Sequence, residues 1–113
     1  FVTYANHAKS EILGIDIKDL DKSGAVSEVV VMAMAEGCLK RTGADHAVAV
    51  TGIAGPTGGT KEKPAGTVFI GIASQENPTF VDSFCFKTDR LMFKEKVSLT
   101  AINLLRKRII GLL

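Results

Sequence analysis

The chain has 113 residues, of which 46% are hydrophobic and 23% are charged, and this composition is typical of a single soluble domain with one core. Its net charge of +2 comes from interspersed acidic and basic residues without a long basic run, so nucleic acid is not expected as a partner. Its longest apolar run is too short to cross a bilayer, so no membrane partner is expected either.

The N-terminal part of the chain predicts a strand followed by a helix. Phe1-Val-Thr-Tyr4 has the pattern of a short apolar strand, and Asn6 is a suitable N-cap for a helix over residues 7–13 that ends at Gly14. Because the sequence begins with what reads as a strand already in progress, we expect the N-terminal part of the domain to lie outside these residues.

Two further helices follow. Asp16 can cap a short helix that runs through Lys22. Ser27 can cap a longer helix over residues 28–42, which has an acidic residue in its first turn, basic residues in its last turn and Gly43 at its end. Charges in this order complement the helix dipole, so this helix is the most strongly predicted element of the chain.

Three strands and a helix complete the pattern. Residues 46–51 and 67–73 are continuous apolar runs, which are typical of strands buried on both faces, and residues 79–86 alternate well enough to form an antiparallel hairpin with the second run. Thr88 or Asp89 can cap a last helix, whose apolar face is formed by Phe93, Val97, Ala101 and Leu104. This order predicts a three-layer α/β/α domain with a mixed sheet.

A glycine-rich stretch, residues 51–66, separates the first two apolar runs. Its five glycines allow close backbone approach, so its amide N–H groups can turn towards a bound polar group beyond the end of a strand. The alternative is a plain reverse connection between adjacent strands. A P-loop is excluded, because Gly59-Thr60-Lys61 lacks the Gly-Lys-Ser/Thr order and is followed by a proline and a strand.

The cysteines and histidines favour neither a disulfide nor a metal site. Cys38 and Cys85 lack Cys-x-x-Cys spacing, so we expect reduced, buried cysteines in a cytoplasmic protein. His7 and His46 lie in different predicted elements without ligand spacing, so no metal or other cofactor is expected.

Seven stretches, covering nearly the whole chain, resemble the C-terminal domain of the CinA family. They are Phe1-Val-Thr-Tyr4 with Asn6 and Lys9, Gly24 to Glu28, Met34 to Gly37, Ala44-Asp45, Thr51-Gly-Ile-Ala-Gly-Pro56, Gly58-Gly59, and Glu62 to Val68. The resemblance implies a nicotinamide-nucleotide amidase, which hydrolyses nicotinamide mononucleotide to nicotinate mononucleotide and ammonia without a cofactor. It also implies that the domain self-associates and that in some members it follows a molybdopterin-binding-like domain.

The resemblance assigns catalysis to a serine-lysine pair. The family's nucleophile is the serine of an Ala-Glu-Ser-Cys-Thr-Gly-Gly motif, which lies upstream of Phe1. Lys9 and Tyr4 match the family's lysine and tyrosine beside that serine, so Lys9 is expected to be the general base and Tyr4 to orient the proton transfer. Ala5 departs from the family's usual serine after the tyrosine. By residue type alone, Lys9 would be a solvated helix lysine.

Substrate contacts are expected from the glycine-rich stretch and from one arginine. The candidates are Thr51, Gly52, Ile53, Ala54 and Gly55, for the amide carbonyl or the ribose phosphate, and Arg90, which can reach a phosphate or lie on the surface.

Two alternatives to the amidase remain open at this point. One is a catalytically silent binding or scaffold domain, and the other is a cysteine hydrolase that uses Cys38 with His46, although an apolar helix face makes a thiol inert.

A further expectation concerns partners. If a strand and a helix lie outside these residues, apolar surface near Phe1 and on Val48 and Val50 is left partly uncovered. Its partner is then the N-terminal segment of the same protein or a second copy in a homo-oligomer.

Overall fold

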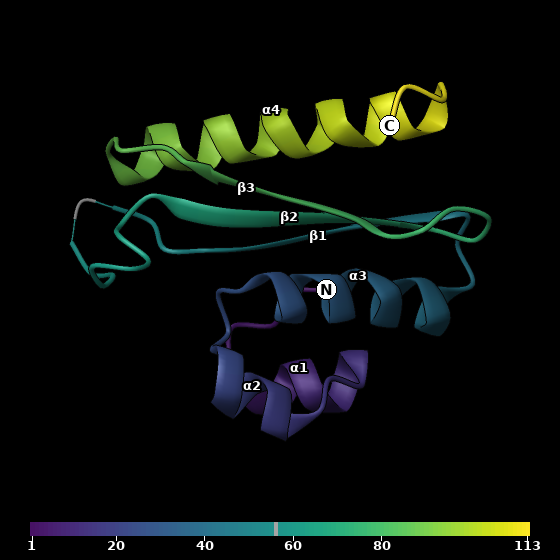
Figure 1. The fold of residues 1–113 in the computed structure, drawn as a ribbon, viewed down its shortest axis with the longest axis horizontal. Helices are drawn as coiled ribbons and strands as arrows, with labels where there is room; N and C mark the ends of the chain where they lie inside the picture. The colour runs from purple at the N-terminus through teal and green to yellow at the C-terminus, as the bar shows by residue number, and fades with distance from the viewer. Residues whose placement is uncertain (56) are drawn as a thin grey trace.

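The computed structural model describes residues 1–55 and 57–113, which form one layered domain (Figure 1). Helix α4 covers one face of a sheet, and α3 covers the other face, with α1 and α2 packed on the outer side of α3. The predicted three-layer α/β/α arrangement is therefore confirmed. The helices are α1 (Asn6–Leu13), α2 (Ile17–Ser23), α3 (Glu28–Thr42) and α4 (Arg90–Ile109), and the strands are β1 (His46–Gly52), β2 (Thr67–Ser74) and β3 (Phe80–Cys85).

The sheet of the described residues is antiparallel throughout, with the order β1-β2-β3. We expected a mixed sheet, which contains both parallel and antiparallel neighbours. Residues 1–4 were expected to form a strand, but they form none in this structure. The side chain of Phe1 instead lies 5.9 Å from the guanidinium of Arg41 at the end of α3. The segment thus lies between the end of α3 and the cavities beside β1, where Phe1 and Val50 share walls, and it forms no strand.

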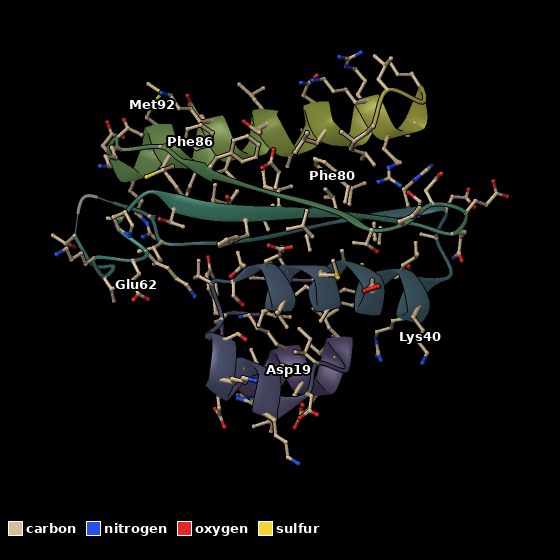
Figure 2. All side chains as sticks on the ribbon, viewed as in Figure 1. Asp19, Lys40, Glu62, Phe80, Phe86 and Met92 are labelled. Carbon is tan, nitrogen blue, oxygen red and sulfur yellow. The ribbon has the colours of Figure 1, made fainter. Side chains whose placement is uncertain are left out.

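Two apolar clusters lie on opposite faces of the sheet, and β2 contributes to both. Phe69 and Ala73 face α3, while Val68, Ile70 and Ile72 are fully buried beneath α4. Phe80 and Phe86 from the β3 side are partly buried and pack against these three side chains (Figure 2). Each fully buried side chain contributes about 1.5–3 kcal/mol through removal of apolar surface from water. The prediction of a strand buried on both faces is confirmed for β2.

The same prediction is wrong for β1, whose side chains alternate between buried and exposed. Ala47, Ala49 and Thr51 face α3 and are buried, whereas Val48 and Val50 remain 39% and 36% exposed on the other face. The reason is that β1 lies at the edge of the sheet and α4 covers its outer face only in part. The expected uncovered apolar surface is therefore present.

Three of the four helix N-caps predicted from the sequence are confirmed. Asp16, Ser27 and Asp89 accept hydrogen bonds from the backbone amides of Lys18, Val30 and Met92, respectively. The fourth prediction is wrong, because Asn6 lies inside α1 and Ala5 occupies its N-cap without a side-chain hydrogen bond. Each capping bond is worth about 1 kcal/mol, so α1 begins with less local support than the others.

Helices α1 and α3 meet at Gly37. A Cβ atom at this position would overlap the backbone carbonyl of Leu13, the last residue of α1. The end of α1 can therefore approach the backbone of α3 only because residue 37 has no side chain.

The cysteines are less buried than expected. Cys38 is half-buried on α3, and Cys85 is exposed at the end of β3; both are free thiols. Cys85 is exposed because it lies on the outer edge strand. None of the helices in the described residues is long and apolar enough to span a membrane.

Candidate active site

A cavity of about 340 Å³ at the carboxyl end of β1 holds four of the predicted site residues. Lys9, Tyr4, Thr51 and Gly52 all line this cavity. Lys9 comes from α1, Tyr4 from the segment before it, and the other two from the end of β1. The fold thus brings the two halves of the predicted site together from separate elements, and we call this space the Lys9 cavity.

Lys9 is the most unusual side chain of the cavity, since it is only 6% exposed. Its Nζ donates a hydrogen bond to the backbone carbonyl of Thr3. The solvated alternative for Lys9 is therefore wrong. Burial desolvates the ammonium group and lowers the pKa of Lys9 below its ordinary value. A lysine with a lowered pKa is neutral in a larger fraction of molecules, and the neutral amine has the lone pair that a general base needs.

Tyr4 lies at the rim of the Lys9 cavity and is 86% exposed. The hydrogen bond of the Lys9 amine goes to the carbonyl of Thr3 and not to the Tyr4 hydroxyl. The role of Tyr4 in proton transfer stays a prediction that this arrangement does not test.

Thr51 and Gly52 differ in what they can donate to a ligand. Thr51 Oγ1 donates to the carbonyl of Ala25 at 2.8 Å, so only its lone pairs are left for a ligand. Gly52 pairs with Val68, next to the hydrogen-bonded pair formed by Ile53 and Thr67. Because hydrogen-bonding residues alternate along an antiparallel strand, the Gly52 N–H points away from β2, on the side of the cavity. It is an available donor for a developing oxyanion.

The rest of the glycine-rich stretch lies elsewhere. The amide of Ile53 is occupied, because it donates to Thr67 at 2.8 Å, and Ala54 packs into the cluster beneath α4. Gly55 lines a second cavity of about 470 Å³, together with Lys87 and Thr88. Pro56, which belongs to the predicted motif, lies outside the described residues.

The stretch also serves as a connection, because it joins two antiparallel strands. Gly59 and Pro64 form an isolated bridge, and the amide of Thr60 bonds the carbonyl of Lys63 at 2.8 Å. The glycine-rich stretch is therefore a reverse connection between adjacent strands, as the alternative interpretation predicted. It can also contribute residues to the two cavities.

Arg90 is the first residue of α4, and its side chain is exposed. It is not among the described residues that line the two cavities. Its predicted contact with a phosphate is untested.

Several residues of the two cavities were missed by the sequence analysis. Ala25, Val26 and Met34 line the Lys9 cavity, and Lys87 lines the second one. The first three carry no chemical signal, because apolar residues mark a wall only when the fold is known. Lys87 and Thr88 follow a predicted strand directly, and polar residues at that position are the signal that would have found them.

A cysteine hydrolase is not favoured by the geometry. His46 Nδ1 lies 3.0 Å from Ser74 Oγ, and Cys38 lies among Leu13 and Met34 in an apolar pocket. The imidazole at the start of β1 is thus paired with Ser74 at the end of β2, and the described residues that line the pocket of the thiol include no base.

Comparisons with known proteins agree on one family. A family model described as the CinA C-terminal domain matches residues 1–109. A CinA-like protein of Akkermansia muciniphila is 52% identical over 90% of this chain, and a putative competence-damage inducible protein of Caldicellulosiruptor saccharolyticus is 49% identical over 98% of it. This chain spans only 25% and 27% of those two relatives, about a quarter of their length.

Solved structures give the same result. A competence/damage inducible protein from Agrobacterium tumefaciens is 39% identical, with a TM-score of 0.88, and the match covers 93% of this chain and 64% of that one. A competence damage-inducible protein A from Klebsiella pneumoniae is 35% identical, with a TM-score of 0.90, over 96% of this chain and 67% of that one. Both sequence and fold therefore match the same group of proteins.

Proposed function

Since the chain belongs to the CinA C-terminal domain family, we propose that it is the base-bearing part of an amidase that hydrolyses nicotinamide mononucleotide to nicotinate mononucleotide and ammonia. The observation that carries this proposal is the burial of Lys9 in a cavity that it shares with Gly52. A buried lysine with a lowered pKa supports base catalysis, and the Gly52 amide, which points away from β2, supports stabilisation of an oxyanion.

The proposed reaction has two halves. The neutral amine of Lys9 takes the proton from a serine hydroxyl supplied from outside residues 1–113, and the serine oxygen attacks the amide carbon of the substrate. The tetrahedral oxyanion accepts a hydrogen bond from the Gly52 N–H. Lys9 returns the proton to the leaving nitrogen, and ammonia departs as the ester forms. Water, deprotonated by Lys9, then hydrolyses the ester and regenerates the serine.

An ammonia-release assay tests this proposal. Residues 1–113 are compared with the full-length polypeptide, by which we mean the product of the whole reading frame that contains them. We expect release of ammonia from nicotinamide mononucleotide by the full-length polypeptide only, because the nucleophile lies outside residues 1–113. Equal turnover by residues 1–113 would contradict the assignment of an external serine, and no turnover by either would contradict the amidase.

A silent binding domain is the second candidate, and one observation favours it. Among the described residues that line the Lys9 cavity there is neither a serine nor a cysteine, and the proton of Thr51 is donated to the carbonyl of Ala25. These described residues therefore lack the serine on which the amidase proposal depends. Binding of nicotinamide mononucleotide to the full-length polypeptide without turnover, measured by calorimetry, would support this candidate.

A further inference from the structure

A single lysine ties the glycine-rich stretch to helix α2. Lys63 is half-buried, and its Nζ donates a hydrogen bond to the backbone carbonyl of Ser23 at 2.9 Å. Ser23 is the last residue of α2, and carbonyls at the end of a helix have no partner within the helix and carry a partial negative charge. The ammonium group of Lys63 therefore satisfies an acceptor that the helix itself cannot satisfy.

The chain that leaves α2, residues 23–26, is held by side chains along its length. Its first three carbonyls each accept a hydrogen bond from a side chain. The middle carbonyl is bonded by the nearby Ser27 at 2.9 Å. The other two are bonded by Lys63 and by Thr51, at 2.9 and 2.8 Å, from near the end and from the start of the glycine-rich stretch. The stretch is thus attached to these residues at two separate points.

Residues 23–26 also form a wall of the Lys9 cavity, and we call them the wall segment. Ala25 and Val26 line this cavity together with Thr51 and Gly52 from the end of β1. Residues 24–26 belong to neither a helix nor a strand. Side-chain hydrogen bonds to their carbonyls therefore replace the regular backbone bonds that fix a helix or a strand.

The two long-range bonds act from different sides of the cavity wall. Thr51 lines the cavity and joins the wall segment to β1. Lys63 is not among the described residues that line the Lys9 cavity, so it holds the wall segment from outside. Loss of the Lys63 bond would therefore release the wall segment without removing a side chain that lines the cavity.

We infer that Lys63 is a positioning residue, which fixes the wall segment against the end of β1 and so determines how closely a ligand fits the Lys9 cavity. The ligand is the nicotinamide nucleotide of the proposed function, on which this part of the inference rests. The wall offers the apolar side chains of Ala25 and Val26, whose contacts are the same in the ground state and in the transition state. A displaced wall therefore weakens substrate binding and leaves proton transfer by Lys9 intact.

The structural half of the inference is tested without a ligand, by amide hydrogen exchange of the full-length polypeptide with mass spectrometry. Lys63→Met keeps the apolar stem and removes the donor. Lys61→Met is the matched control, because Lys61 is an exposed lysine of the same stretch. We expect peptides that cover residues 23–30 to exchange about fivefold faster or more in Lys63→Met, since the Gly24 amide at the end of α2 opens with the wall segment. These peptides should be unchanged in Lys61→Met, and peptides from β2 should be unchanged in both variants.

The functional half is tested by ammonia release from nicotinamide mononucleotide with the same variants. Lys63→Met should raise KM about tenfold and leave kcat nearly unchanged, which is the reverse of the result expected for loss of a general base. Lys63→Arg retains a charged donor and should restore KM to within about threefold of the original value. Lys61→Met should change neither constant.

Three results would overturn the inference. The first is equal exchange of residues 23–30 in Lys63→Met and Lys61→Met. The second is a kcat that falls as much as KM rises and is not restored by Lys63→Arg. The third is loss of protection throughout β2 in Lys63→Met, because the lysine would then support the whole fold and not one wall. If the unsubstituted full-length polypeptide releases no ammonia, the proposed function fails, and the exchange rates alone decide whether Lys63 positions the wall segment.

Discussion

At the β3 edge of the sheet, Asp82 is exposed and its carboxylate bonds the outward amide of Ser83. At the β1 edge, Val48 and Val50 leave both their backbone groups and part of their side chains open. The two edges belong to the same small sheet, yet one is closed by polar groups and the other is apolar. The difference teaches that two edge strands of one sheet can differ in side-chain chemistry, so that one edge discourages further pairing and the other does not.

The largest effect is expected in the strand between the two edges. Ile70 of β2 is fully buried beneath α4, whereas Val50, its partner on β1, is half-exposed. In residues 1–113, Ile70→Ala should lower the free energy of unfolding by about 2–5 kcal/mol, because it leaves a cavity. Val50→Ala should cost less than half as much. Urea denaturation measures both, and equal losses would contradict an open β1 edge.

The next effect concerns the site beside the open edge. Lys9→Ala in the full-length polypeptide should lower kcat about a hundredfold and leave KM nearly unchanged, because a general base acts in the transition state. Lys94→Ala is the control, since Lys94 is an exposed lysine of α4 that lines neither cavity. Ammonia release gives both constants. A Lys9→Ala variant with normal kcat would remove Lys9 from the proposed mechanism.

A smaller effect follows from the pKa of Lys9. Burial lowers this pKa in the folded state, so between the lowered value and about 10.5 the unfolded chain binds more protons than the folded one. The free energy of unfolding of residues 1–113 should therefore rise with pH through this window, by at most about 1.4 kcal/mol per unit of separation. Lys9→Met should remove this rise, and an unchanged pH profile in that variant would contradict the assignment.

The smallest change in folding stability is expected when the chemistry of the two edges is exchanged. Asp82→Val should remove the polar closure of β3, and Val50→Asp should introduce a charge at β1. In residues 1–113 Asp82→Val should change the unfolding free energy by no more than about 0.5 kcal/mol, because Asp82 lies at the surface. Self-association, measured by light scattering, should increase with the first and decrease with the second. A decrease in self-association with Asp82→Val and an increase with Val50→Asp would contradict the proposed difference between the two edges.

Helix positions were well predicted from the sequence, because local signals determine them. The caps at Asp16, Ser27 and Asp89 and the stop at Gly43 are local hydrogen bonds and backbone preferences that need no knowledge of the fold. Asn6 failed as a cap because Ala5 has the extended backbone of the N-cap, so the helix begins one residue earlier than expected.

Strand burial and the site were predicted only in part. Residues 46–51 and 67–73 are both mostly apolar runs, but one forms an edge strand and the other the central strand, and the neighbouring strands decide this. The resemblance to the family named Lys9, Thr51 and Gly52, which the structure brings into one cavity. The Ile53 N–H cannot serve a ligand because it donates to the carbonyl of Thr67. These two residues are far apart in the sequence, so no local pattern predicts this bond.

Gly37 controls the Lys9 cavity from a distance. The approach of α1 to α3 depends on the absence of a single carbon atom at this position, and α1 carries Lys9. A methyl group there would act as a wedge that tilts or shifts α1, and the Lys9 amine would move away from the carbonyl of Thr3 and from the end of β1. If the proposed function holds, a substitution at Gly37 should therefore lower activity although residue 37 does not line the Lys9 cavity.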